Sequence, residues 1–173
     1  MKSIREIYEE SFALEETADG RAFLALVKPF LQHPAVRVLE EYRHHMSINR
    51  LQHVVSVAYI AYHICRKQGL RVEETCLAAL MHDLFYFDNK RGDRPAHPWR
   101  RHPAIAWDNA RQLHPFTEVG KDIISRHMWP LTLRLPRTPE GRIVSWADKY
   151  CAWREFLLSC RQIFYIAIRK PNT

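Results

Sequence analysis

Apolar residues recur at the spacing of an α-helix along almost the whole chain, and this spacing is the strongest constraint on the fold. In the segment 47–69, for example, His53, Val57, Ile60 and Ile64 share one stripe. The sequence shows no convincing strand-like alternation and no hairpin dipeptide such as Asn-Gly. Only 5 of the 173 residues are glycine. These features predict an all-α fold in a single domain that spans residues 1–173.

Capping residues, prolines and glycines indicate where the helices begin and end. Ser47 is the expected N-cap of the helix that Gly69 terminates, and Pro103 suits the first turn of a later helix. Helices are predicted at residues 2–17, 20–32, 35–45, 47–69, 72–87, 103–113, 117–127 and 142–168, the last segment as one helix or two. Residues 88–101 and 129–139 contain five of the ten prolines and are predicted to be irregular.

The charge and the hydropathy pattern limit the partners. The net charge of +7 favours anions, and nucleotides, phosphates and nucleic acids all fit that description. No stretch of 18 apolar residues exists and the first residues lack the apolar core of a signal peptide, so we expect a cytoplasmic protein without membrane contact. The four cysteines lie in apolar segments without a Cys-x-x-Cys pair, and we expect buried, reduced thiols.

The dipeptide His82-Asp83 is the sharpest chemical feature of the sequence. It follows an apolar run from Leu77 to Met81, near the predicted end of a helix. A buried carboxylate is costly unless it is paired or bound to a metal ion. A hydrogen bond at the helix end is the simpler alternative for the dipeptide alone.

Two further polar residues lie in apolar helical settings. His53 falls on the apolar stripe of segment 47–69, and Asp148 ends the apolar run from Ile143 to Ala147. Taken alone, a histidine such as His53 is more often a hydrogen-bonded core residue than a metal ligand. Together, however, three apolar segments each present imidazole or carboxylate groups, which are the preferred ligands of Zn, Mn, Fe, Co or Ni. The sequence therefore predicts a metal site at His53, His82, Asp83 and Asp148.

The order His53, His82-Asp83, Asp148 resembles the signature of the HD superfamily of metal-dependent phosphohydrolases. The similarity covers about residues 42–155, including the apolar approach to His82-Asp83. It implies a single HD-type helical bundle. Its parts would be N-terminal helices within residues 1–45, a metal-site core over about 46–155 and a C-terminal helix to about 168.

The resemblance also implies roles for two more histidines. Some members of the superfamily bind two metal ions through an added histidine at each of the places where this chain has His102 and His127. In that arrangement His53, His82 and Asp148 would hold one ion, the two added histidines would hold the other, and Asp83 would bridge the ions. The alternative is that both are simply histidines at helix ends.

One bacterial subgroup of stand-alone HD proteins is similar in two more places. This chain and that subgroup share an aromatic run after the His-Asp pair, here Phe85 to Phe87. They also share a His-Met-aromatic-Pro-Leu-Thr motif, here His127 to Thr132. The resemblance does not extend to the cyclic dinucleotide phosphodiesterases, because the Gly-Tyr-Pro motif of that branch is missing.

Three cationic residues next to predicted ligands are candidates for binding a substrate phosphate. They are Arg101, Arg126 and Lys149. The arginines and the lysine in segment 88–101 could similarly steer phosphate, and a plain solvated loop explains them equally well.

The resemblance implies hydrolysis of a phosphomonoester or phosphodiester in a nucleotide or another small phosphorylated metabolite. The cofactor would be two divalent transition-metal ions, with Mn, Fe, Ni, Co and Zn as the candidates. Mg is a further candidate. Asp83 would be the catalytic residue that accepts the proton of the attacking water. Two alternatives stay open: a di-iron oxygenase of HD type, and a non-enzymatic sensor of nucleotides or nucleic acid. We expect no nucleic-acid partner for the enzyme, and the sequence does not predict its oligomeric state.

Overall fold

The described part of the chain is a helical bundle. A computed structural model describes residues 2–43, 48–87 and 95–169, and within them the secondary structure is helical apart from an isolated bridge between Arg43 and Asn49. The helices are α1 (Ile4–Glu10), η1 (Leu14–Glu16), α2 (Ala18–Leu31), α3 (Pro34–Arg37), η2 (Val38–Glu41), α4 (Arg50–Gln68), α5 (Val72–Leu80), α6 (Pro98–Leu113), α7 (Glu118–Arg126) and α8 (Pro139–Arg169). The predicted all-α fold is confirmed.

The N-terminal region contains more breaks than predicted. Ser3 caps α1 through a capping box, and Thr17 caps α2, so the predicted helix 2–17 is in fact α1, a turn and η1. Gly20 does not break a helix but lies inside α2, against the backbone of Leu14. A Cβ at this glycine would lie 2.0 Å from the carbonyl oxygen of Leu14. Close packing of η1 on α2 therefore explains this glycine.

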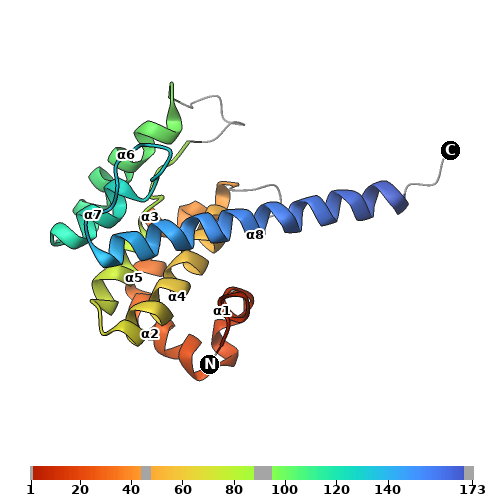
Figure 1. The fold of residues 1–173 in the computed structure, drawn as a ribbon, viewed down its shortest axis with the longest axis horizontal. Coiled ribbons are helices and arrows are strands. Elements are labelled where there is room, and N and C mark those ends of the chain that lie inside the picture. The colour runs from red at the N-terminus through yellow and green to blue at the C-terminus, as the bar shows by residue number, and fades with distance from the viewer. Residues whose placement is uncertain (1, 44–47, 88–94, 170–173) are drawn as a thin grey trace.

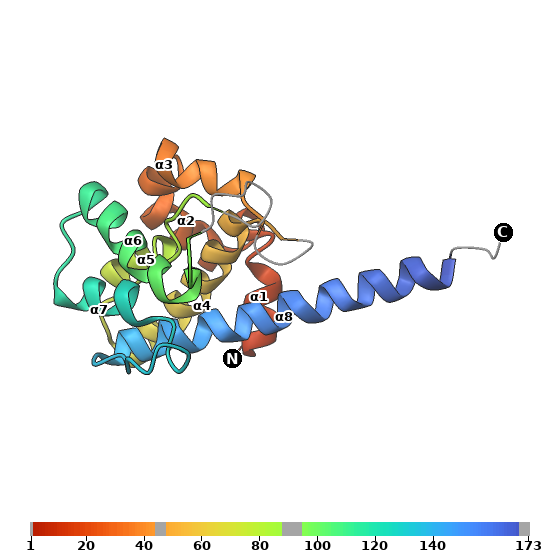
Figure 2. The ribbon, with the colours of Figure 1, turned by 90° about the horizontal axis from the view of Figure 1, so that it is seen from above.

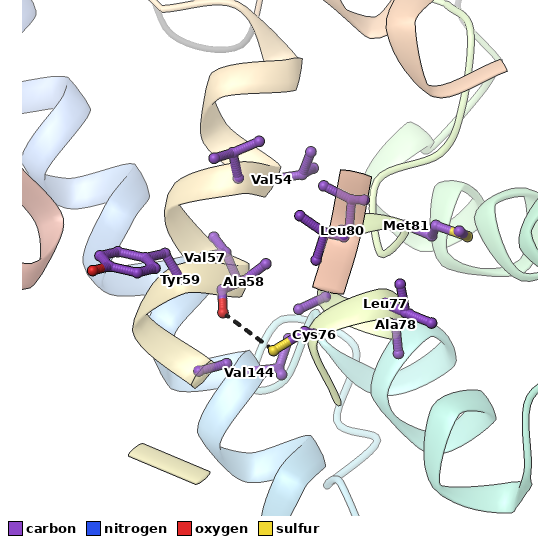
Figure 3. Packing of buried hydrophobic residues seen from close by; sticks show 14 of the residues in the cluster. Val54, Val57, Ala58, Tyr59, Cys76, Leu77, Ala78, Leu80, Met81 and Val144 are labelled. Atoms are coloured by element: carbon purple, nitrogen blue, oxygen red, sulfur yellow. Dashed lines mark hydrogen bonds between the residues drawn. The ribbon is translucent and has the colours of Figure 1, made fainter. Parts of the chain in front are cut away.

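Helix α4 is the centre of the bundle. Its most extensive contacts are with α5 and then α8, and it also touches α1 and η2. Figure 3 shows Leu80 of α5 beside Val54 and Val57 of α4, and the Cys76 thiol of α5 directed toward the Ala58 carbonyl of α4. These side chains are fully buried or nearly so. The core between α4 and α5 thus fixes where the residues that follow α5 enter the molecule.

Capping defines both ends of α4. Asn49 is the N-cap, since its side chain accepts a hydrogen bond from the Gln52 amide, and the predicted cap Ser47 lies outside the described residues. Gly69 ends the helix as predicted, with a φ of 66° that favours glycine.

The end of α5 and the start of α6 also differ from the predictions. Helix α5 ends at Leu80, so His82 and Asp83 lie in the turn after it. Helix α6 begins at Pro98 rather than near Pro103, which makes residues 98–101 helical instead of part of a loop. Proline tolerates the first helical position because its missing N–H has no intrahelical partner there. The basic residues Lys90, Arg91 and Arg94 lie outside the described residues.

Helix α8 is one continuous helix from Pro139, and it begins three residues earlier than predicted. Its first half packs against α4 and α7, and both views show its C-terminal half standing clear of the other helices (Figures 1 and 2). Cys65, Cys76 and Cys151 are buried free thiols as expected, but Cys160 is exposed because it lies on the part of α8 that leaves the bundle.

The sequence predicted a protein without membrane contact, and the length and apolar character of the helices bear on that prediction. None of the helices among the described residues combines the length and the apolar character needed to cross a membrane.

Glu10 connects the N-terminal helices to the bundle. Its carboxylate accepts hydrogen bonds from the hydroxyls of Tyr59 and Thr17, both at 2.5 Å, and pairs with Lys2 at 2.6 Å. Burial disfavours the charged carboxylate, but these three partners outweigh that effect and lower the pKa of Glu10 from an ordinary 4.5 to about 2.

We predict that Glu10→Gln lowers the free energy of unfolding by about 1.5–3 kcal/mol at neutral pH. Because the folded-state pKa is depressed, the contribution of Glu10 is complete above pH 4.5 and is lost as the pH falls toward 2. Urea unfolding at several pH values should show the difference from the unmodified protein shrinking over that range. Glu16→Gln, at an exposed site nearby, is the control. A pH-independent difference would contradict the assignment.

Candidate metal centre

The turn after α5 positions His82 and Asp83. Because the helix ends at Leu80, the Ala79 carbonyl is available to a side chain, and it accepts a hydrogen bond from His82 Nδ1 at 2.7 Å. The Nε2 atom of His82 then faces the two site aspartates, 3.9 Å from Asp83 Oδ2 and 3.9 Å from Asp148 Oδ1. All of these side chains are buried.

His53 reaches the site from the first turns of α4. Its Nε2 atom lies 3.2 Å from Asp148 Oδ1, and its Nδ1 atom lies 2.8 Å from Glu155 Oε1. Both acids are on α8, so the ring lies between two carboxylates of one helix. His53 and Glu155 are fully buried.

His102 and His127 approach Asp83 from the other side. Their Nε2 atoms lie 3.2 Å and 3.5 Å from Asp83 Oδ1, and 2.9 Å from each other. The Nδ1 atoms are again held by carbonyl oxygens, Pro98 at 3.0 Å for His102 and Ile124 at 2.8 Å for His127. The end of α7 and the start of α6 thus supply one imidazole each.

All six predicted ligands therefore come together in one buried cluster. In two groups of three residues, the possible ligand atoms, one from each residue, all lie within 4.8 Å of the others in the same group. The groups are His53, His82 and Asp148, and His82, Asp83 and His127. Each of the four imidazoles has an oxygen acceptor behind Nδ1 and directs Nε2 inward. This is how histidine ligands of metal ions are usually oriented, because the outer hydrogen bond fixes the tautomer.

Both aspartates carry charge in spite of their burial. Burial by itself would raise the pKa of Asp83, but His82 and two further histidines hold it well below its ordinary 3.8. Burial acts on Asp148 in the same way, and the hydrogen bond from His53 and the charge of Lys149 hold its pKa well below 3.8. A buried pair of anions of this kind favours a cation between them.

The histidines differ in their protonation. Burial and the neighbouring histidines hold the pKa of His127 well below 6.5, and burial lowers that of His82. Both rings are thus neutral near pH 7 and present lone pairs. Burial would also lower the pKa of His53, but Glu155 and Asp148 outweigh it and raise that pKa to about 10. A positive charge next to Asp148 is therefore favoured.

Two observations test whether these residues fit a metal ion. First, His82 Nε2 is buried and has no hydrogen-bond partner among the described residues. Second, Nδ1 of both His102 and His127 faces a carbonyl, and their Nε2 atoms lie 2.9 Å apart beside Asp83 Oδ1. Two nitrogen ligands at right angles, each about 2.1 Å from an ion, lie about 3 Å apart. The donor set and the spacing fit divalent transition metals.

The comparisons with known proteins agree with this geometry. The family model described as HD domain matches residues 50–153. This match covers more than half of the chain, and the chain belongs to the HD domain family, whose members are generally metal-dependent hydrolases that bind divalent metals. Searches of the curated proteins and of the solved structures returned no significant match.

Of the three residues predicted to bind phosphate, Lys149 directly contacts two of the predicted metal ligands. Its Nζ atom is 2.8 Å from Asp148 Oδ2 and also donates to the His127 carbonyl, and its side chain is about one third exposed. It therefore stands beside two ligand residues with part of its surface open to solvent.

The two arginines are placed differently. Arg126 pairs with Asp122, Nε to Oδ1 at 3.1 Å, and donates to the Leu135 carbonyl at 3.2 Å. The hydrogen bond to Leu135 connects α7 to the segment that leads to α8. Arg101 is exposed in the first turn of α6, next to His102. The roles of both in substrate binding stay predictions.

Sequence reasoning missed two residues behind the site. Glu155 supports His53, but a glutamate on a long helix is usually solvent-exposed, and only its spacing of seven residues from Asp148 indicated that both share a face. Arg50 is the second of these residues. It is buried and donates to the Phe85 and Phe87 carbonyls at 2.6 and 3.1 Å, which holds the aromatic run that follows Asp83.

We predict that His102→Ala and His127→Ala each lower the metal content to about one ion per chain. The reason is that both contact the same Asp83 oxygen and would share one ion. Elemental analysis after loading with Mn²⁺ and desalting measures this. His114→Ala is the control, since His114 lies at the opposite end of α6, about 18 Å from His102 along the helix. If both histidines only stabilise helix ends, the substitutions will change stability by at most about 1–2 kcal/mol and leave the metal content unchanged.

Proposed function

We propose that this chain is a metal-dependent phosphohydrolase that hydrolyses a phosphomonoester or phosphodiester in a nucleotide or another small phosphorylated metabolite. The arrangement of Asp83 carries the proposal. Its Oδ2 atom faces His82, whereas its Oδ1 atom faces His102 and His127. A carboxylate whose two oxygens face two separate sets of histidines is suited to bridging two cations.

The proposed ligand sets follow from these contacts. His53, His82 and Asp148 would hold one ion, His102 and His127 would hold the second, and Asp83 would contact both. Divalent ions held in this way lower the pKa of water and neutralise phosphoryl oxygens as charge develops on them. Mn, Fe, Ni, Co and Zn suit the mixed nitrogen and oxygen ligands best, and Mg remains an option.

The side chains have separate tasks in the proposed reaction. The Asp83 carboxylate is ionised, so it can accept the proton of the attacking water. Asp83 and Asp148 are 5% and 7% exposed, so both are largely shielded from solvent. Lys149, whose side chain is about one third exposed and contacts Asp148, would bind a non-bridging oxygen of the phosphate. Arg101 and Arg126 are proposed as further phosphate ligands.

A pocket next to Lys149 supports a substrate with an apolar or aromatic part. It has a volume of about 380 Å³, and Trp129, Pro130 and Trp146 form much of its wall. Exposed tryptophans can stack on a nucleobase. The phosphate of such a substrate would then lie toward Lys149 and the metal centre.

We predict that Asp83→Ala abolishes metal-dependent hydrolysis and lowers the metal content, while the fold survives. The substitution removes a ligand and the proposed bridge, but it also removes a buried anion. The experiment combines three measurements: elemental analysis of protein purified without added metal, a panel of phosphomonoesters and phosphodiesters assayed with Mn²⁺, Ni²⁺, Co²⁺ or Mg²⁺, and circular dichroism of both proteins. Asp108→Ala, at an exposed position on α6, is the control.

Either of two results would contradict the proposed function. Full activity of Asp83→Ala would show that the His-Asp pair is structural. Iron as the only bound metal, with a diffuse visible absorption and no hydrolysis of any substrate in the panel, would favour the oxygenase alternative.

We predict a separate effect for Lys149→Gln, namely a decrease in kcat/KM of about 10–100-fold with an unchanged metal content. One charged hydrogen bond to the phosphate contributes about 1.5–3 kcal/mol, which accounts for this range. Lys121→Gln is the matched control, because Lys121 is exposed and pairs with Glu118 instead. Loss of metal together with activity would assign Lys149 to support of Asp148 rather than to substrate binding.

A further inference from the structure

His53 differs from the other three histidines in the group that holds its Nδ1 atom. His82 and His127 follow the ends of their helices, and each bonds a carbonyl three residues back in the chain. His102 bonds the carbonyl of Pro98, four residues back. His53 instead bonds the side chain of Glu155, which is 102 residues away in the sequence.

His53 lies in the first turns of α4, and its backbone N–H donates to the Asn49 carbonyl at 3.2 Å. Helix α4 then continues to Gln68, so the ring does not follow a helix end as those of His82 and His127 do. The acceptor of its Nδ1 is a side chain of another element, α8.

Helix α8 presents two acids to the same ring. Asp148 and Glu155 are seven residues apart, which is about two helical turns, and so they share one face of α8. Asp148 Oδ1 lies 3.2 Å from Nε2, and Glu155 Oε1 lies 2.8 Å from Nδ1. Between them on this face lies the buried Cys151.

Glu155 is costly to the fold unless it has a specific role. Its side chain is fully buried, and taking a carboxylate out of water costs several kcal/mol before any pairing. It also lies two residues beyond the segment that matches the HD domain model. The family match therefore does not include it.

We propose that Glu155 is a positioning residue of the metal centre. Its carboxylate accepts the Nδ1–H hydrogen bond of His53, keeps that hydrogen on Nδ1 and directs the Nε2 lone pair toward the ion beside Asp148. A carboxylate is a stronger acceptor than a carbonyl, so it also strengthens Nε2 as a donor to the ion. This inference rests on the metal centre of the proposed function and adds a residue to it.

The test compares Zn²⁺ binding by four metal-stripped full-length proteins: unmodified, Glu155→Gln, Glu155→Ala and Glu140→Gln. Competition with a chromophoric chelator gives the affinities. We expect Glu155→Ala to weaken the tighter-bound Zn²⁺ about 10–100-fold, and Glu155→Gln to weaken it less because an amide oxygen still accepts the hydrogen bond. Glu140→Gln is the matched control, because Glu140 is also a buried glutamate on α8 but contacts the Arg71 backbone N–H instead of a ligand.

The second readout is the tautomer of each imidazole, from ¹H–¹⁵N spectra of the Zn²⁺-loaded proteins. In Glu155→Ala, His53 should lose its fixed Nδ1–H signal, whereas His82, His102 and His127 should keep theirs because backbone carbonyls hold them. A purely structural glutamate would leave the His53 signal unchanged.

The outcomes separate this inference from the proposed function. Unmodified protein that binds no Zn²⁺ would overturn both. Unmodified protein that binds Zn²⁺ together with Glu155→Ala of equal affinity and the same His53 tautomer would overturn this inference alone. If Glu155→Ala does not fold, Glu155→Gln decides: an affinity lower than that of Glu140→Gln supports the inference, and an equal affinity overturns it.

Discussion

The carboxylate of Asp83 is buried against three imidazoles, and the rest of the structure depends on how this anion is accommodated. His82, His102 and His127 hold its pKa well below the ordinary value, so it is charged inside the protein. An anion in such a setting needs positive charge nearby. The inward-facing Nε2 atoms are nitrogen donors of the kind that divalent transition metals bind, so the ligand cluster as a whole favours metal ions.

The helix ends make this arrangement possible. A helix leaves the carbonyls of its last turn without partners, and here those of α5 and α7 each orient one histidine. The metal centre therefore lies where these helices end and α6 begins, over the core formed by α4 and α5. For His53, which lies within α4, the buried side chain of Glu155 on α8 takes the place of the carbonyl.

Much of this site could be predicted from the sequence, because its ligands are the polar residues that interrupt apolar helical segments. All six predicted ligands do meet in the structure. The helix boundaries were less predictable. Helix α5 ends at Leu80, and the Ala79 carbonyl accepts a hydrogen bond from the ring of His82. No local pattern in an apolar run indicates that the helix ends at this point. Glu155 was missed for the opposite reason. It looks like an ordinary polar residue of an amphipathic helix, and only the tertiary contact with His53 shows that it is buried. Cys160 was expected to be buried because its neighbours are apolar, but α8 has left the bundle at that point.

The central claim is that the six residues hold two divalent ions bridged by Asp83. Anomalous X-ray diffraction from crystals grown with Mn²⁺ tests it most directly, because the method locates each ion independently of activity. The account predicts two anomalous peaks, one beside His53, His82 and Asp148 and one beside His102 and His127, with an oxygen of Asp83 at each. Crystals that show no anomalous density within this cluster at saturating Mn²⁺, with ions bound only elsewhere on the surface, would contradict it.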